Sequence, residues 1–179
     1  MEENEVFEEN DAPTTKSVAK KWGIINGLIS IAFFIIIDVT GQAGNQALSW
    51  VGYVIFGVIV FLAHKEFKSE GDGYMSYGQG LGIGTLAMVF SSLISSVFFF
   101  IYVSFVSTSF IEAIKENQII SMQEDGMSDA EIDQAMGFTE FFMTPVAMTV
   151  MGFIFAIFFG FIVSLLVSIF TKNQAPELR

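Results

Sequence analysis

Carboxylates able to bind a cation gather in one short stretch of the second half of the chain. They are Glu124, Asp125, Asp129, Glu131 and Asp133. Oxygen ligands of this kind suit calcium, but the stretch lacks the twelve-residue ligand ladder of an EF-hand loop. A solvated acidic face is therefore the favoured interpretation, with calcium binding as the alternative, and we expect no metal site.

A second candidate for chemistry is the glycine-rich run Tyr77-Gly78-Gln79-Gly80-Leu81-Gly82-Ile83-Gly84. Phosphate-binding loops also use glycines, but their spacing is G-x-G-x-x-G or G-x-x-x-x-G-K-[ST], and no lysine follows the glycines here. We interpret the run as the closely packed start of a helix. A re-entrant or broken helix, of the type that transporters use at binding sites, is the alternative.

The remaining reactive side chains are few. The chain has no cysteine and one histidine, His64, which excludes disulfides, thiolate nucleophiles, thiolate zinc sites and multi-histidine metal sites. Asp38 and His64 fall at the ends of apolar stretches, where an interface with water is expected and charge costs little. Because no catalytic constellation is visible, we expect neither an enzyme nor a cofactor.

Long apolar stretches dominate the 179 residues, of which 53% are hydrophobic and only 15% charged. A helix needs roughly 20 apolar residues to cross a bilayer, and only helices satisfy their own backbone in lipid over such stretches. The sequence thus predicts an all-α polytopic membrane protein whose transmembrane domain, residues 17–171, has four spans. These lie at about 18–39, 47–63, 81–106 and 145–170, the second being slightly short.

The basic residues predict the orientation of these spans. With four spans, every lysine and arginine except Lys115 falls on one side of the membrane, namely Lys16, Lys20, Lys21, Lys65, Lys68, Lys172 and Arg179. The positive-inside rule makes that side cytoplasmic. We therefore expect a multi-pass protein of the bacterial inner membrane with both termini cytoplasmic, including an acidic and disordered tail at 1–16 and a short tail at 172–179.

Small residues predict where the helices pack. The fourth span has one at every fourth position, which places Gly152, Ala156, Gly160, Ser164 and Ser168 on one helix face. Such a face lets another helix approach closely in lipid. In the third span, Gly80 and Gly84 are likewise one turn apart. Packing within the bundle is the favoured interpretation, and an interface with a second copy or a partner membrane protein is the alternative.

Two polar stretches also predict structure. Asn26 and Ser30, one turn apart in the first span, are interpreted as interhelical hydrogen-bonding groups. Segment 108–144 is too polar to span, but it carries an apolar stripe, a break at Asp125–Gly126 and a capping box, Ser128 to Glu131. It is predicted to be an amphipathic, extracytoplasmic helical hairpin between the third and fourth spans, folded back on the membrane surface or on itself.

Two sequence motifs carry a resemblance to a known family. One is Met75-Ser76-Tyr77-Gly78-Gln79-Gly80, preceded by Lys65-Glu66-Phe67-Lys68. The other is Gly126-Met127-Ser128-Asp129, followed by Ile132 and Gln134-Ala135-Met136. With four spans in this order, the chain resembles the bacterial membrane family named domain of unknown function 4199 (DUF4199), found mostly in the Bacteroidetes. The resemblance covers roughly residues 17–171 and implies a four-helix inner-membrane protein without assigned functional residues.

These observations favour a non-catalytic membrane protein: a scaffold, an accessory subunit or a small oligomer. Its expected partner is the lipid bilayer, with a second copy or another membrane protein as a further candidate, and no nucleic acid is expected. The alternative is a small lipid or glycolipid carrier, similar in size to four-span flippases that serve polyprenyl-phosphate glycosyltransferases. A carrier would need basic residues near lipid headgroups, and Lys65 and Lys68 are a modest supply.

Overall fold

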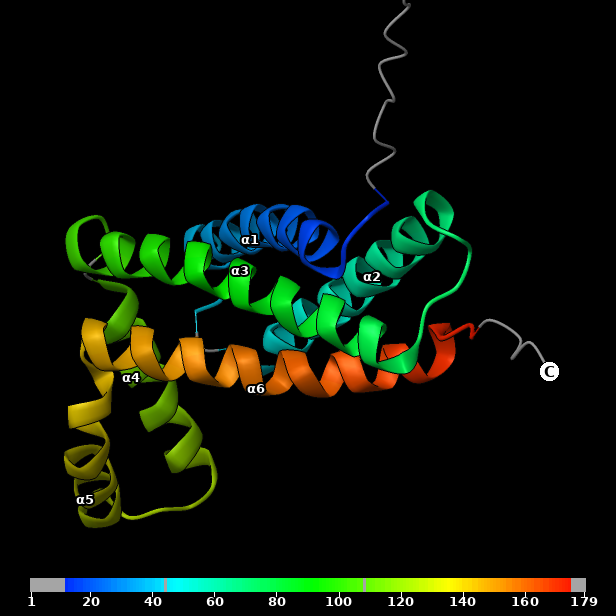
Figure 1. The fold of residues 1–179 in the computed structure, drawn as a ribbon. Helices are drawn as coiled ribbons and strands as arrows, with labels where there is room; N and C mark the ends of the chain where they lie inside the picture. The colour runs from blue at the N-terminus through cyan, green and yellow to red at the C-terminus, as the bar shows by residue number, and fades with distance from the viewer. Residues whose placement is uncertain (1–11, 44, 108, 175–179) are drawn as a thin grey trace, which may run out of the picture.

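The computed structural model describes residues 12–43, 45–107 and 109–174. The regular secondary structure of this part is helical, apart from one isolated bridge between Met75 and Asn173. The described residues form six α-helices and one short 3₁₀ helix, and Figure 1 shows how the α-helices are arranged. In chain order they are α1 (Thr15–Val39), α2 (Gln46–Glu70), α3 (Tyr77–Phe105), α4 (Ser109–Glu124), α5 (Asp129–Thr139), η1 (Glu140–Met143) and α6 (Pro145–Thr171).

Four of these helices are long and apolar enough to cross a membrane: α1, α2 over Trp50–Glu70, α3 and α6. Hydroxyl caps explain why two of them begin earlier than hydropathy predicts. Thr14 accepts from the Ser17 amide, so α1 already includes part of the tail predicted for residues 1–16. Ser76 and Gln79 form a capping box at the start of α3, which is thus a regular helix rather than a re-entrant one. The predictions for 1–11 and 175–179 lie outside the described residues.

The second span differs most from its prediction, because α2 continues to Glu70 instead of ending near residue 63. Hydropathy alone misses the last two turns, since Phe67 is their one apolar side chain. Phe67 is buried there, whereas Lys65 and Ser69 are exposed. This longer helix changes the expected environment of His64, described below.

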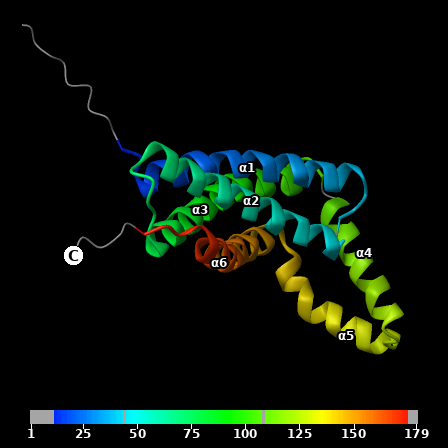
Figure 2. The ribbon, with the colours of Figure 1, turned by 90° about the vertical axis from the view of Figure 1, so that its right-hand side faces the viewer.

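The helix α3 is the centre of the bundle, packed along α1 on one side and α6 on the other, with α2 in contact with all three. Figures 1 and 2 show that α4 and α5 lie at one end of the four long helices, and that the described chain ends lie at the other. At that second end the backbones of Met75 and Asn173 exchange two hydrogen bonds of 2.7 and 2.9 Å. These bonds join the start of α3 to the end of α6.

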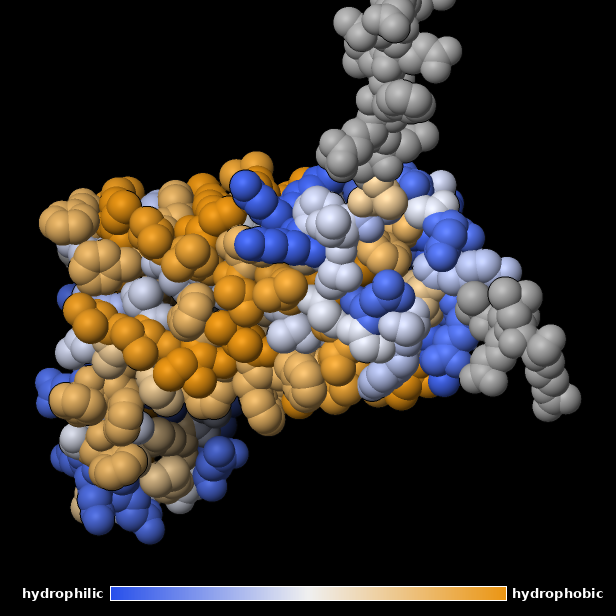
Figure 3. All heavy atoms as spheres, viewed as in Figure 1, coloured by the Kyte–Doolittle hydropathy of each residue, from blue (hydrophilic) through white to orange (hydrophobic). Residues whose placement is uncertain are grey.

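The surface of the bundle is apolar over most of its length (Figure 3). Large side chains such as Leu28, Val54, Phe158 and Leu166 are more than half exposed. Burying such side chains is the main driving force of folding in water, so this belt requires a hydrocarbon environment. The bilayer is thus the surrounding of these four helices.

Candidate functional site

The predicted small-residue stripe on α6 lies partly against α3. A Cβ atom on Gly160 would overlap Met88, and one on Gly84 would overlap the Ser164 hydroxyl. A Cβ on Gly80 would come within 3.0 Å of Ser168 Oγ. These residues therefore form a close α3–α6 contact within the monomer.

Two members of the stripe lie elsewhere. Gly152 is exposed, and a Cβ there would meet no atom within 4 Å. Ala156, half-buried, packs at the edge of the core beside Met88. The stripe is continuous in sequence, but α6 follows α3 closely only from about Gly160 onward.

A second close contact, between α1 and α3, was not predicted. A Cβ on Gly23 would come within 2.6 Å of the Ala87 carbonyl oxygen, and one on Gly27 within 3.3 Å of Ile94. The signal was present in the sequence, because Gly23 and Gly27 form a GxxxG pair that permits such an approach. In the same contact, Asn26 Nδ2 donates to Ser91 Oγ at 2.7 Å, which confirms the interhelical role predicted for Asn26.

His64 corrects the expectation that it faces water, since its side chain is fully buried between α2, α3 and α6. Its Nε2 lies 2.8 Å from the Gly80 carbonyl oxygen, and its Nδ1 lies 2.7 Å from Thr171 Oγ1. A carbonyl can only accept, so Nε2 carries the proton. His64 thus joins three helices at the end where the chain termini lie. In the same region, Lys68 Nζ donates to the Thr171 carbonyl at 3.0 Å, which adds a second bond between α2 and α6.

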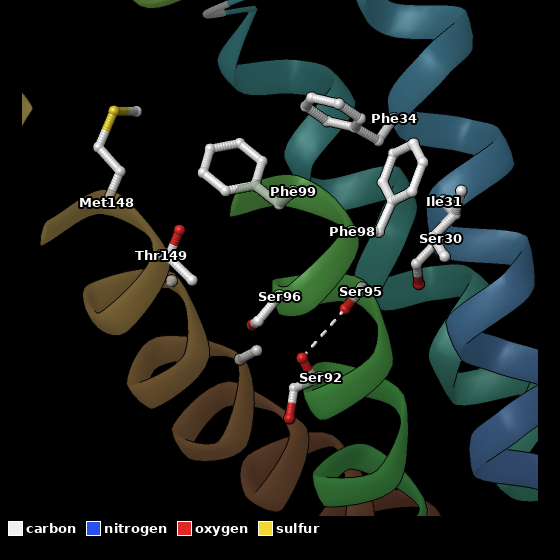
Figure 4. A pocket seen from close by; sticks show the side chains of 12 residues that line it. Ser30, Ile31, Phe34, Ser92, Ser95, Ser96, Phe98, Phe99, Met148 and Thr149 are labelled. Carbon is white, nitrogen blue, oxygen red and sulfur yellow. Dashed lines mark hydrogen bonds between the residues drawn. The ribbon is translucent and has the colours of Figure 1, made fainter. Parts of the chain in front are cut away.

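A cavity of about 190 Å³ opens between α1, α3 and α6 in the half of the bundle nearer to α4. Figure 4 shows its floor of serines from α3, with phenylalanines at one end and α6 along one side. A neighbouring cavity of the same volume reaches under α2 and shares Ser30, Ser92, Ser95 and Ala156 with it. These two cavities are the candidate functional site.

Hydroxyl groups line this cavity, but several are already engaged within their own helices. Ser92 donates to the Val89 carbonyl, Ser95 to the Ser91 carbonyl and Thr149 to the Pro145 carbonyl, at 2.7–3.1 Å. Hydroxyls bonded in this way have no proton left to donate and can only accept a hydrogen bond from a solute. The cavity therefore suits an apolar chain better than a hydrated ion or a sugar.

The segment containing α4 and α5 contacts the bundle through residues of α4. The Phe110 ring lies 5.0 Å from the ring of Phe34 on α1, and Asn117 Nδ2 donates to the Ala43 carbonyl at 2.7 Å. Nearby, the Tyr102 hydroxyl donates to Asp38 at 2.7 Å, which ties the ends of α1 and α3 together. Beyond Asn117, the two helices extend away from the bundle (Figure 2).

The break between α4 and α5 falls at Gly126, whose φ of +81° favours glycine. At the start of α5 the Glu131 carboxylate accepts from both the amide and the hydroxyl of Ser128, at 2.8 and 2.7 Å. These two bonds lower the pKa of Glu131 below its ordinary value. Within the described residues, no three histidine or acidic side chains are placed to hold a metal ion.

The fold and its apolar belt define a multi-pass helical membrane protein with four spans. The family model described as "Protein of unknown function (DUF4199)" matches residues 21–173, and the chain belongs to this family. No curated protein and no solved structure shows significant similarity to the chain.

Proposed function

We propose that the protein is a non-catalytic accessory subunit of an assembly in the bacterial inner membrane, and that it contacts its partner through α4 and α5. The observation that supports this proposal is that the segment folds as a pair of helices and is not a loop. It is a capped, acidic pair of helices that is anchored to the bundle at Phe110 and Asn117 and is otherwise largely exposed.

Charge supports both the orientation and the kind of partner. The described lysines of the bundle cluster at the end where α1 begins and α2 and α6 end, so that end is cytoplasmic by the positive-inside rule. The α4–α5 segment is then outside. It contains Lys115 and the acidic residues Glu112, Glu116, Glu124, Asp125, Asp129, Glu131, Asp133 and Glu140. A membrane protein with a basic extracytoplasmic surface complements this charge.

A photocrosslinker at exposed Gln134 in α5 tests the proposal in native membranes. We expect one discrete crosslinked membrane protein from Gln134, and its loss when Asp129 and Asp133 are both changed to lysine. The matched control places the same crosslinker at lipid-facing Phe158 on α6. The proposal is wrong if Gln134 yields no discrete product, or if the product survives the charge reversal.

The carrier remains a second candidate because the cavity between α1, α3 and α6 suits an apolar chain. A carrier must also move a charged headgroup, and the Lys68 ammonium is already bonded to the end of α6. Purified protein in vesicles that contain a fluorescent phospholipid would separate the two roles. Protein-dependent exposure of inner-leaflet label to an impermeant quencher would favour the carrier over the accessory subunit.

A further inference from the structure

Three phenylalanines just before α6 form the most exposed aromatic group on the α4–α5 segment. Phe138 and Phe141 are 76% and 75% exposed, and Phe142 is 42% exposed. Their rings touch one another, with centroids 5.4 Å apart for Phe141–Phe142 and 6.1 Å for Phe138–Phe142. We call these three residues the aromatic edge. Water alone is a poor environment for an apolar group of this size.

The position of the aromatic edge in the chain, directly before a membrane-spanning helix, places it near the membrane surface. Helix η1 passes through the Thr144 cap directly into α6 at Pro145, so Phe141 lies four residues before a membrane-spanning helix. At the same end of the bundle, Trp50 near the start of α2 and Phe105 at the end of α3 are 62% and 77% exposed. Trp is typical of the interface between lipid headgroups and acyl chains, and exposed Phe is typical of the apolar face of a helix that lies in that interface.

The distribution of apolar and hydrophilic side chains on the rest of the α4–α5 segment agrees with this position at the membrane surface. Figure 3 shows apolar side chains where the α4–α5 segment adjoins the bundle and hydrophilic ones at its far end. On α5, Ile132 is buried, whereas Asp129, Glu131 and Asp133 are exposed. Most acidic side chains of the segment, from Glu124 to Asp133, thus lie at or near the distal turn, whereas Glu112 and Glu140 lie near the bundle.

We propose that the aromatic edge inserts into the headgroup–acyl boundary of the bilayer on the α4–α5 side, and so holds the end of α5 against the lipid surface. The occupant of this surface is lipid, in continuity with the lipid around α6. The distal acidic residues then project into water. This inference does not depend on the accessory role, because it concerns a surface that purified protein in plain vesicles already presents.

Spin labels on single cysteines test the proposal, since the chain has no cysteine of its own. The label replaces Phe141, with lipid-facing Phe158 and exposed Asp133 as the two reference sites. The protein is reconstituted into phosphatidylcholine–phosphatidylglycerol vesicles. Collision of each label with oxygen, which partitions into lipid, is compared with collision with a water-soluble nickel chelate.

We expect the Phe141 label to collide with oxygen far more than with the nickel chelate, giving a ratio close to that of Phe158 and several-fold above that of Asp133. A ratio equal to that of Asp133 would mean that the edge faces water and would overturn the proposal. Protection from both reagents would mean that protein covers the edge, as in a second copy, and would overturn it as well. All three positions are exposed, so none of the substitutions removes a core contact.

Discussion

Two glycines of the same stripe give opposite predictions for the same substitution. Gly160 and Gly152 both lie on α6, eight residues apart, and both are changed to alanine. A Cβ at Gly160 would overlap Met88, with Met88 Cβ only 2.8 Å away, whereas a Cβ at Gly152 would meet nothing within 4 Å. Gly160→Ala should therefore destabilise the bundle and Gly152→Ala should not.

The magnitudes follow from two opposing effects. Alanine favours a helix over glycine by about 0.5–1 kcal/mol, a gain available at both positions. Forcing a methyl group into a packed contact costs about 1–3 kcal/mol. Since Met88 Cβ is fixed to the α3 backbone, a rotamer change cannot fully relieve the overlap at Gly160. The net loss expected there is about 1–2 kcal/mol, against a gain of up to about 1 kcal/mol at Gly152.

Reversible unfolding in mixed micelles, followed by circular dichroism, measures both changes in the free energy of unfolding. A double-mutant cycle adds Met88→Ala, which removes Cγ, Sδ and Cε and should lower the cost of Gly160→Ala. Equal effects of the two glycine substitutions would refute the idea that α6 packs closely on α3 at Gly160 and diverges at Gly152. So would a cost at Gly160 that is unchanged by Met88→Ala.

Three further predictions concern the buried histidine, the capping box and the orientation. His64→Leu should lower the free energy of unfolding by about 1–3 kcal/mol in the same assay, because it removes two buried hydrogen bonds between helices. Because hydrogen bonds from Ser128 lower the Glu131 pKa, their stabilisation of α5 should be full above the ordinary glutamate pKa and fade as pH falls through the lowered value. The protection of the α5 amides from hydrogen exchange, relative to their intrinsic exchange rate at each pH, should fall over that range in wild type. Protection that does not change with pH would contradict a stabilising capping box. Single cysteines at Ser69 and Ser121 test orientation: an impermeant thiol reagent should label only the second on intact cells, and the reverse pattern would invert the topology.

The sequence predicted the four spans because their length and hydropathy are physical requirements of the bilayer. It misplaced the end of α2, since the polar stretch around Phe67 resembles a loop in a hydropathy window but continues as a helix. His64 was misjudged for the same reason, because the true end of α2 places it inside the bundle. The stripe on α6 identified a real contact at Gly160, but no local pattern reveals where two helices diverge. That depends on crossing angles, which are set by the packing of both partners.

The glycines show that α3 and α6 pack more closely toward the chain termini than toward α4, although grooves of about 650 and 410 Å³ also open at the terminal end of the bundle. Toward the termini, Gly80 and Gly84 lie in close contact with α6, and His64 joins α2, α3 and α6. Toward α4, Gly52 on α2 and Gly152 on α6 both line cavities, and neither has an atom within 4 Å of a Cβ position. Close packing resists deformation, whereas open space between helices permits it. A lipid chain, a partner helix or a movement of α4 and α5 should therefore act on the open end, while the histidine end keeps the helices in register.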